Sequence, residues 1–162
     1  MSYTNQRVET EHKLGEHVYA MAQMGRSVVL IEDSDDHAEL VRRALKLSAE
    51  RHELVRFEDG EQALSYLISS PEGESNLAKC AVILLDLSLP GLSGLEVLQA
   101  LRELDKTVCP VVVLTTSEGG EDIAAAYANG ARAYCVKPVD LKSFRELVQD
   151  LTNFWVKWNK LP

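Results

Sequence analysis

The sequence predicts an α/β protein with a doubly wound, five-stranded parallel sheet of strand order 2-1-3-4-5. From residue 27 onward, five short apolar runs alternate with longer amphipathic stretches, which is the pattern of βα units. The third run, 80–85, is apolar throughout, as expected for a central parallel strand covered on both faces. Because crossovers between parallel strands are right-handed, this strand order is the natural arrangement of five such units.

Each predicted strand is a short apolar run that ends at a polar or turn residue. The first run reads VVLI and is followed at once by two acidic residues. The fourth and fifth runs end at threonine and at a lysine-proline pair. We therefore expect strands at 28–31, 53–57, 80–85, 110–114 and 132–136.

The stretches between the strands carry helical periodicity or helix-boundary residues. Apolar residues between Leu40 and Leu45 recur on one face, and Asp35 and Asp36 are interpreted as caps of this first helix. Gly130 is a favourable residue just past the end of an alanine-rich helix. We expect helices at 35–49, 60–68, 94–104, 121–129 and 140–158, and a loop rich in Pro, Gly and Ser at 69–76.

The chain divides into an N-terminal extension, 1–25, and one domain, 26–162. The extension lies outside the alternating pattern, and we expect it to be either helical or disordered. With 162 residues, 46% of them hydrophobic and 26% charged, the composition is that of a globular domain. The longest apolar runs are too short to span a membrane, and the N-terminus lacks the apolar core of a signal peptide.

Charge and cysteine content narrow the classes of function. The net charge of -8 disfavours nucleic-acid binding, because an acidic surface repels phosphate backbones. Such a surface suits a protein partner or a site for a divalent cation. The cysteines Cys80, Cys109 and Cys135 lack metal-type spacing, and we interpret them as reduced, buried thiols of a cytoplasmic protein. A redox role is the alternative.

Polar side chains follow four of the five predicted strands. Glu32 and Asp33 follow the first strand, Asp86 the third, Thr115 the fourth and Lys137 the fifth. Ligands bind beyond the carboxyl ends of parallel strands, and these four strands are neighbours in the predicted order, so we expect the groups to converge. Each residue alone could be a helix cap, a strand-end hydroxyl or a surface charge. Their combination at adjacent strand ends favours a functional site.

The chemistry of these groups suits phosphoryl transfer. Three carboxylates close together repel one another unless a cation neutralises them, and oxygen ligands indicate a hard ion such as Mg²⁺. An ammonium and a hydroxyl can bind phosphoryl oxygens, and in-line phosphoryl transfer needs mainly positioning and charge neutralisation. We therefore interpret Asp86 as a carboxylate nucleophile that accepts a phosphoryl group.

Four motifs resemble the receiver domains of two-component response regulators, over roughly residues 26 to 152. They are VVLIEDSDD (28–36), ILLDLSLPGLSG (83–94), VVVLTTS (111–117) and YCVKP (134–138). The resemblance implies a flavodoxin-like receiver fold and a phosphoacceptor with at most slow self-dephosphorylation rather than an enzyme. It also implies a histidine kinase or a phosphotransfer protein as the partner that phosphorylates Asp86.

Carried over to this sequence, the resemblance implies a metal site. Asp33, Asp86 and the backbone carbonyl of Ser88 would bind Mg²⁺ directly, and Glu32 would act through a water molecule.

The same resemblance implies a set of phosphoryl-binding and switch residues. Thr115 would be the switch hydroxyl and Lys137 the phosphoryl-contacting lysine, with a cis peptide bond to Pro138. Tyr134 matches the aromatic residue that turns inward when the hydroxyl moves towards the phosphoryl group. A buried strand tyrosine is the alternative for Tyr134.

The end of the chain resembles that of the phytochrome-associated single-domain response regulators, so the donor could be a phytochrome-type kinase. No output domain is expected, so output would pass through the domain's own surface. Apolar residues recur at steps of three and four along the last helix, and its end exceeds what a five-stranded sheet can cover. We expect a homodimer contact through this helix and strand five, at Tyr127, Phe154, Trp155 and Trp158. Packing of the aromatic residues against the N-terminal extension is the alternative.

Two other functions remain open at this point. An Asp-nucleophile phosphatase or phosphotransferase would need a second Asp two residues after the nucleophile, where Ser88 stands. A flavin-binding module on the same sheet order would meet Glu32 and Asp33 after the first strand, and these would repel the flavin phosphate.

Overall fold

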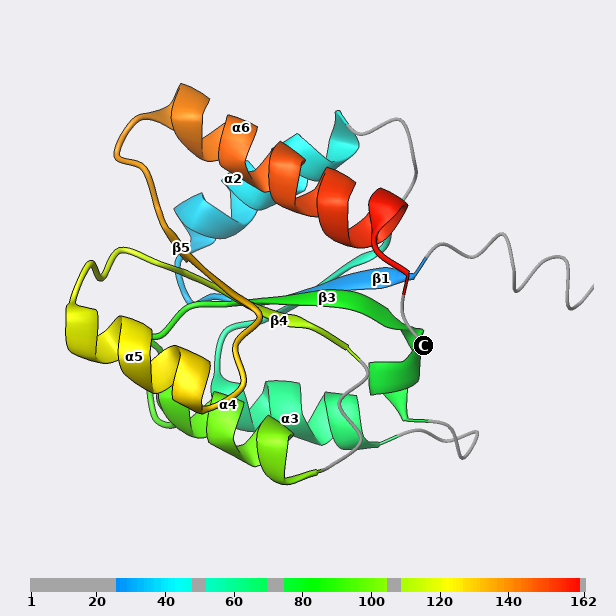
Figure 1. Ribbon diagram of the computed structural model, residues 1–162. Coiled ribbons are helices and arrows are strands. Elements are labelled where there is room, and N and C mark those ends of the chain that lie inside the picture. Colours follow the sequence, from blue (N-terminus) through cyan, green and yellow to red (C-terminus); the bar gives the residue numbers. More distant parts are fainter. Residues whose placement is uncertain (1–25, 48–51, 70–74, 105–108, 161–162) are drawn as a thin grey trace, which may run out of the picture.

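The computed structural model describes residues 26–47, 52–69, 75–104 and 109–160. These residues form one sheet of five parallel strands in the order β2-β1-β3-β4-β5, so the predicted fold class and strand order are confirmed (Figure 1). The N-terminal extension, 1–25, lies outside the described residues. The strands are β1 (Ser27–Ile31), β2 (Leu54–Phe57), β3 (Cys80–Leu85), β4 (Val111–Thr115) and β5 (Ala133–Val136).

Helices cover both faces of the sheet. One face packs against α2 (Asp35–Lys46) and α6 (Leu141–Thr152), as Figure 1 shows above the sheet. The other face packs against three helices and a short 3-10 turn: α3 (Gly60–Ile68), α4 (Gly94–Glu103), α5 (Gly120–Ala128) and η1 (Asn76–Lys79).

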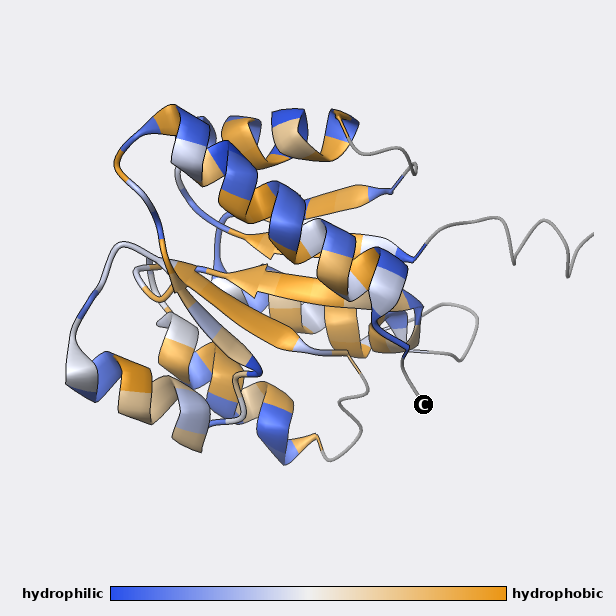
Figure 2. Cartoon of the chain, turned by 45° about the horizontal axis from the view of Figure 1, so that its top comes forward, coloured by the Kyte–Doolittle hydropathy of each residue, from blue (hydrophilic) through white to orange (hydrophobic). Residues whose placement is uncertain are grey.

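Two apolar layers hold the helices to the sheet. Alternate residues of a strand point to opposite faces, so Val28 and Leu30 of β1 belong to one layer and Val29 and Ile31 to the other. All five residues of β1 are buried. The strands are accordingly apolar along their length, whereas the helices are apolar on one side (Figure 2).

The register of the sheet brings the strand ends to one edge. Ile31 lies beside Leu85, and Thr115 lies beside Val136. The residues that directly follow β1 and β3 therefore start from adjacent strands, whereas β4 lies between β3 and β5. This geometry places the predicted site residues above a single edge of the sheet.

The start of α2 corrects one interpretation of the sequence. Ser34, rather than Asp35 or Asp36, is the N-cap, and its Oγ accepts a hydrogen bond from the backbone N–H of His37. The two aspartates lie in the first turn, where a negative charge is favourable beside the positive end of the helix dipole. The helix ends at Lys46, three residues before the predicted end.

The last helix reaches residue 158 as predicted, but its type changes along the way. α6 ends at Thr152, and a π-helical turn, η2 (Asn153–Trp158), follows it. The hydroxyl of Thr152 donates to the carbonyl oxygens of Val148 at 2.8 Å and Gln149 at 3.1 Å. These side-chain hydrogen bonds lie at the change of helix type, and the backbone N–H of Asn153 still donates to the carbonyl oxygen of Gln149.

Candidate functional site

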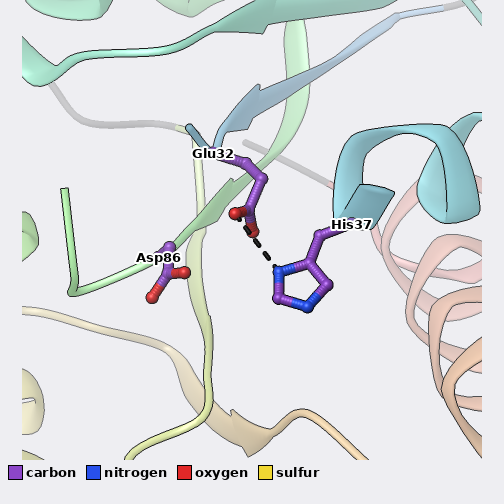
Figure 3. A group of neighbouring side chains, drawn as sticks. All are labelled: Glu32, His37 and Asp86. Carbon is purple, nitrogen blue, oxygen red and sulfur yellow. Dashed lines mark hydrogen bonds and ion pairs between the residues drawn. The ribbon is translucent and has the colours of Figure 1, made fainter. Parts of the chain in front are cut away.

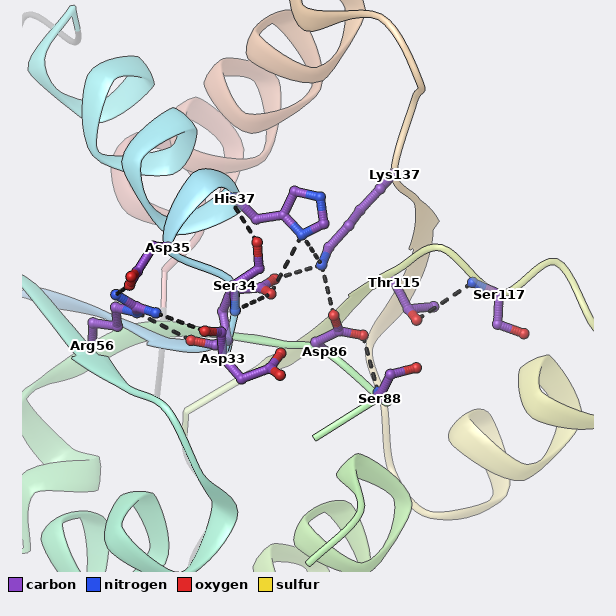
Figure 4. A network of polar contacts seen from close by, with 11 residues as sticks. Asp33, Ser34, Asp35, His37, Arg56, Asp86, Ser88, Thr115, Ser117 and Lys137 are labelled. Atoms are coloured by element: carbon purple, nitrogen blue, oxygen red, sulfur yellow. Dashed lines mark hydrogen bonds and ion pairs between the residues drawn. The ribbon is translucent and has the colours of Figure 1, made fainter. Parts of the chain in front are cut away.

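Lys137 joins the ends of three strands. It follows β5, and its Nζ lies 2.7 Å from Oδ2 of Asp86, which follows β3, and 2.5 Å from Oε2 of Glu32, which follows β1 (Figure 4). All three residues are buried, with exposed fractions of 5%, 6% and 1% for Lys137, Asp86 and Glu32. The predicted convergence of acidic and basic groups at this edge is present in the structure.

Burial makes this ion-pair cluster energetically demanding. A charge removed from water is costly unless it is paired and hydrogen-bonded, and here one ammonium faces two carboxylates. Two ionised carboxylates and one ammonium leave the cluster with net negative charge. The pocket is therefore suited to receive further positive charge.

The pKa of Asp86 is lowered despite its burial. Burial is the largest single influence and raises this pKa. The hydrogen bond and charge of Lys137, the backbone N–H of Ser88 and the hydroxyl of Thr115 lower it, and together they outweigh the burial. Asp86 is consequently ionised at neutral pH, as a nucleophile must be.

Three hydrogen bonds involve the other predicted site residues Ser88, Thr115 and Tyr134. The backbone N–H of Ser88 donates to Oδ1 of Asp86 at 3.1 Å, which fixes the carboxylate opposite Lys137. Thr115 is fully buried, and its Oγ1 accepts from the backbone N–H of Ser117 at 3.4 Å. The hydroxyl of Tyr134, a half-buried residue on β5, donates to the carbonyl oxygen of Ser117 at 3.1 Å.

Asp33 lies at the exposed rim of the site. Its carboxylate does not belong to the tight group of ligand atoms around Asp86 among the described residues, and it is open to solvent. Its backbone carbonyl accepts from Nη2 of Arg56 at 3.1 Å, while Nε of the same arginine donates to the carbonyl of Glu32 at 3.1 Å. Nη1 of Arg56 reaches Oδ1 of Asp35 at 2.6 Å. One guanidinium thus shapes the acidic loop after β1.

Sequence reasoning missed Arg56, because it looked for polar residues after the end of each strand. Arg56 is the penultimate residue of β2, the strand beside β1. Its long side chain reaches the neighbouring strand end from within the sheet. A search that included the last two residues of each strand would have found it.

His37 was also missed, although it lies in the first turn of α2 above the same edge. Its Nδ1 lies 3.0 Å from Nζ of Lys137 (Figure 4) and 3.4 Å from Oε1 of Glu32 (Figure 3). Among the described residues, Glu32, His37 and Asp86 form a group whose potential ligand atoms all lie within 4.8 Å of one another. The available signal was position, since the first turn of a helix lies over the strand end that precedes it.

The prediction of a cis peptide bond between Lys137 and Pro138 was wrong. No peptide bond is cis in the part of the chain that the structure describes. The trans form of an X–Pro bond is favoured by about 0.5–1 kcal/mol in the absence of other constraints. With a trans bond the ammonium of Lys137 already reaches both buried carboxylates.

The four residues predicted to contact a partner differ in exposure and lie on two faces of the sheet. Tyr127, Phe154 and Trp158 are 51%, 52% and 68% exposed. Trp155 is partly buried against the apolar layer under α6, with its ring edge-on to Phe154 at 4.9 Å between centroids. Tyr127 belongs to α5 on the opposite face of the sheet, so the four residues do not form one continuous patch on a single face.

A buried aspartate, a lysine from the end of β5 and a threonine hydroxyl from the strand between them, placed on this fold, define a phosphoacceptor domain of the receiver class. The model of the response regulator receiver domain family matches residues 28–149. The chain therefore belongs to this family.

The relatives include phytochrome response regulators. The response regulator Rcp1 of Synechocystis is 38% identical over 136 residues, which are 83% of this chain and 92% of Rcp1. The crystal structure of its Mn²⁺-bound form superposes with a TM-score of 0.73 at 35% identity, over 85% of this chain and 99% of that one. The phosphorylated cyanobacterial phytochrome response regulator RcpA superposes with a TM-score of 0.76 at 32% identity, over the same shares.

The family, its relatives and the helices of this chain support some general statements. Receiver domains are typically phosphoacceptors rather than enzymes, and they work with histidine kinases. The Mn²⁺-bound relative and the acidic cluster of this chain together indicate divalent-metal binding. In the described part of the chain, no helix has the length and apolar character to cross a membrane.

Replacing Lys137 by Met should destabilise the fold in a pH-dependent way. In a metal-free buffer at pH 7, we expect the free energy of unfolding to fall by about 3 kcal/mol, because two buried carboxylates lose their counter-charge. At pH 4.5 the loss should be smaller. Without the ammonium, burial raises the pKa of Asp86, so the carboxyl group protonates and the repulsion disappears. Urea unfolding at both pH values measures the difference.

The direction of the pH dependence distinguishes the variant from the parent protein. In the parent the pKa of Asp86 is lowered, so its stabilising contribution is present at neutral pH and is lost only as the pH falls through that lowered pKa. The matched control is Lys142→Met, since Lys142 forms an exposed pair with Glu146 at 3.8 Å. An equal loss for Lys137→Met at both pH values would contradict this account of the cluster.

Proposed function

We propose that this chain is a single-domain response regulator that accepts a phosphoryl group on Asp86 with the help of Mg²⁺. The donor is a histidine kinase of the phytochrome type, or a phosphotransfer protein supplied by one. One observation carries the proposal: the ionised carboxylate of Asp86 is held 2.7 Å from the buried ammonium of Lys137 at the sheet edge. The similarity to Rcp1 and RcpA supports the choice of donor.

In the proposed reaction, an oxygen of Asp86 attacks the phosphorus of a phosphohistidine. The new oxygen–phosphorus bond forms as the phosphorus–nitrogen bond breaks, and the departing imidazole takes up a proton from solvent. Lys137 stabilises the charge on the transferred group, and Thr115, whose hydroxyl already influences Asp86, contacts a phosphoryl oxygen.

The residues at the site fit a hard dication on the side of Asp33. A metal ion centred among Glu32, His37 and Asp86 would need the position of the Lys137 ammonium, which contacts all three. We therefore assign the ion to Asp33, Asp86 and the backbone carbonyl of Ser88, with Glu32 acting through water. When bound, the ion neutralises the carboxylates and the incoming phosphoryl oxygens.

Catalytic turnover is not part of this proposal. An Asp-nucleophile phosphatase uses a second acid two residues after the nucleophile, and Ser88 cannot serve as one.

The cytoplasmic location expected from the sequence belongs to the proposal as well. Its support is that all three cysteines are free thiols, with Cys80 and Cys109 buried and Cys135 half-buried.

We further propose that phosphorylation tightens a homodimer formed through η2 and the edge strand β5. Phe154 and Trp158 are large apolar side chains that no described residue covers fully. β5 is the last strand of the sheet, so one of its edges is unpaired in the described structure. Tyr127 can join this contact only if the partner subunit extends around β5 to the other face.

Phosphorylation of Asp86 can be tested directly with a small-molecule donor. Acetyl phosphate and Mg²⁺ should add the mass of one phosphoryl group to the intact protein, because the donor replaces phosphohistidine in the same displacement. Asp86→Asn should remain unmodified under the same conditions, while Asp36→Asn, an exposed aspartate in the first turn of α2, should be modified like the parent. A phosphate that persists on Asp86→Asn would overturn the assignment.

The metal assignment predicts different effects for two neighbouring residues. Asp33→Asn should weaken Mn²⁺ binding by at least about tenfold, because a charged ligand is lost. His37→Asn should change it by less than about threefold, because His37 contacts Lys137 rather than the ion. Titration of free Mn²⁺ by electron paramagnetic resonance gives both constants. The reverse order of effects would place the ion in the Glu32–His37–Asp86 group.

Dimer formation predicts a role for Trp158. Trp158→Ala should raise the dissociation constant of the phosphorylated dimer by at least about tenfold, as expected for truncation of an aromatic anchor. Size-exclusion chromatography with light scattering over a concentration series measures this constant. Leu47→Ala is the control, since Leu47 is similarly exposed, at 63%, but lies at the end of α2. Equal dissociation constants for parent and Trp158→Ala would remove η2 from the interface.

A further inference from the structure

His37 contacts both the phosphoacceptor site and helix α6. Its Nδ1 lies 3.0 Å from Nζ of Lys137, and its ring stacks on the ring of Phe144 with 6.0 Å between centroids and 20° between planes. The backbone N–H of His37 donates to Oγ of Ser34, the N-cap of α2. The imidazole is therefore held at a fixed point between Lys137 and α6 (Figure 4).

The contact with Lys137 determines the tautomer of His37. An ammonium group can only donate hydrogen bonds, and its three hydrogens match the three acceptors around it: Glu32, Asp86 and His37. Nδ1 must then be the acceptor, with the ring proton on Nε2. The longer approach of Nδ1 to Oε1 of Glu32, 3.4 Å, brings two acceptors together and is not a hydrogen bond in this arrangement.

Phe144 connects His37 to the end of the chain. It is 2% exposed and lies in the apolar layer between the sheet and helices α2 and α6. Val148 belongs to the same layer, and Trp155 packs against it. Two direct contacts, Lys137 with His37 and His37 with Phe144, therefore lead from the site into the apolar layer against which Trp155 of η2 packs.

This series of contacts is separate from the predicted switch pair. Tyr134 packs with the apolar layer on the other face of the sheet, under α3, α4 and α5. Thr115 and Tyr134 are both hydrogen-bonded to the backbone of Ser117, in the loop before α5. Neither of them touches the face that carries α6, so a response in η2 needs another connection.

We propose that His37 couples the phosphorylation state of Asp86 to α6 and η2, an inference that rests on the proposed function. A phosphoryl group on Asp86 adds negative charge and new acceptor oxygens beside Lys137. Hydrogen bonds from an ammonium to charged oxygens are roughly twice as strong as those to a neutral acceptor, so the contact with His37 is the one that Lys137 gives up. The released imidazole changes its position against Phe144, and α6 responds.

The two tryptophans of the chain report on this response. Trp155 and Trp158 both lie in η2, so tryptophan fluorescence, excited at a wavelength that tyrosine does not absorb, follows the end of the chain alone. With acetyl phosphate and Mg²⁺, the parent protein should change its emission in proportion to the phosphate measured by intact mass. His37→Leu and Phe144→Leu should each reduce the change per phosphate at least threefold. Asp36→Asn, next to His37 but exposed, should keep it.

Two more variants separate the two contacts of His37. His37→Asn keeps an acceptor near the position of Nδ1 but loses the ring, and His37→Phe keeps a ring but loses the acceptor. Each should reduce the fluorescence change as His37→Leu does, because coupling needs both contacts. The double variant His37→Leu/Phe144→Leu should lose no more than either single variant, as expected for residues that act in series.

The outcomes separate this inference from the proposed function. If the parent takes up no phosphate, the proposed function fails and the coupling fails with it. If the parent is phosphorylated but His37→Asn, His37→Phe and Phe144→Leu give the full fluorescence change per phosphate, the coupling alone is overturned. Far-UV circular dichroism establishes that each variant is folded before it is compared.

Discussion

The ion pairs between Lys137 and the carboxylates of Asp86 and Glu32 are the interaction on which the site depends. They join the ends of β1, β3 and β5, which are far apart in the sequence. A buried carboxylate without a counter-charge would protonate or draw in water, and neither state would leave a nucleophile in place. The same three residues therefore fix the shape of the pocket and the charge of Asp86.

The surroundings of the cluster are ordered by hydrogen bonds rather than by apolar packing. Arg56 binds two backbone carbonyls of the acidic loop, and Ser34 caps the helix that follows it. Asp33 remains exposed at the rim, where a hydrated dication can reach it without crossing the apolar layers. The buried ammonium of Lys137 and the exposed carboxylate of Asp33 thus differ in their access to solvent, as the proposed separation of the lysine contact from the metal site requires.

The sheet separates two sets of contacts that start at the site, one towards α5 and one towards α6. Thr115 and Tyr134 lead to the loop before α5 on one face, whereas His37 and Phe144 lead to α6 on the other. Because interdigitated apolar layers are densely packed, a displacement at the strand edge is transmitted along a face more readily than across the sheet. The aromatic residues of η2 lie at the end of the second direction.

The sequence by itself determined the fold and the central group of the site. Apolar runs with a polar residue at each end specify parallel strands whose ends meet, so Asp86, Glu32 and Lys137 could be placed together without coordinates. The tertiary structure alone decided which polar group touches which. The reach of Arg56 from an adjacent strand and the stacking of His37 under α6 depend on side-chain directions in space, which no one-dimensional spacing records. The change to a π-helix after Thr152 likewise lies in the backbone hydrogen-bond pattern, which apolar periodicity does not register.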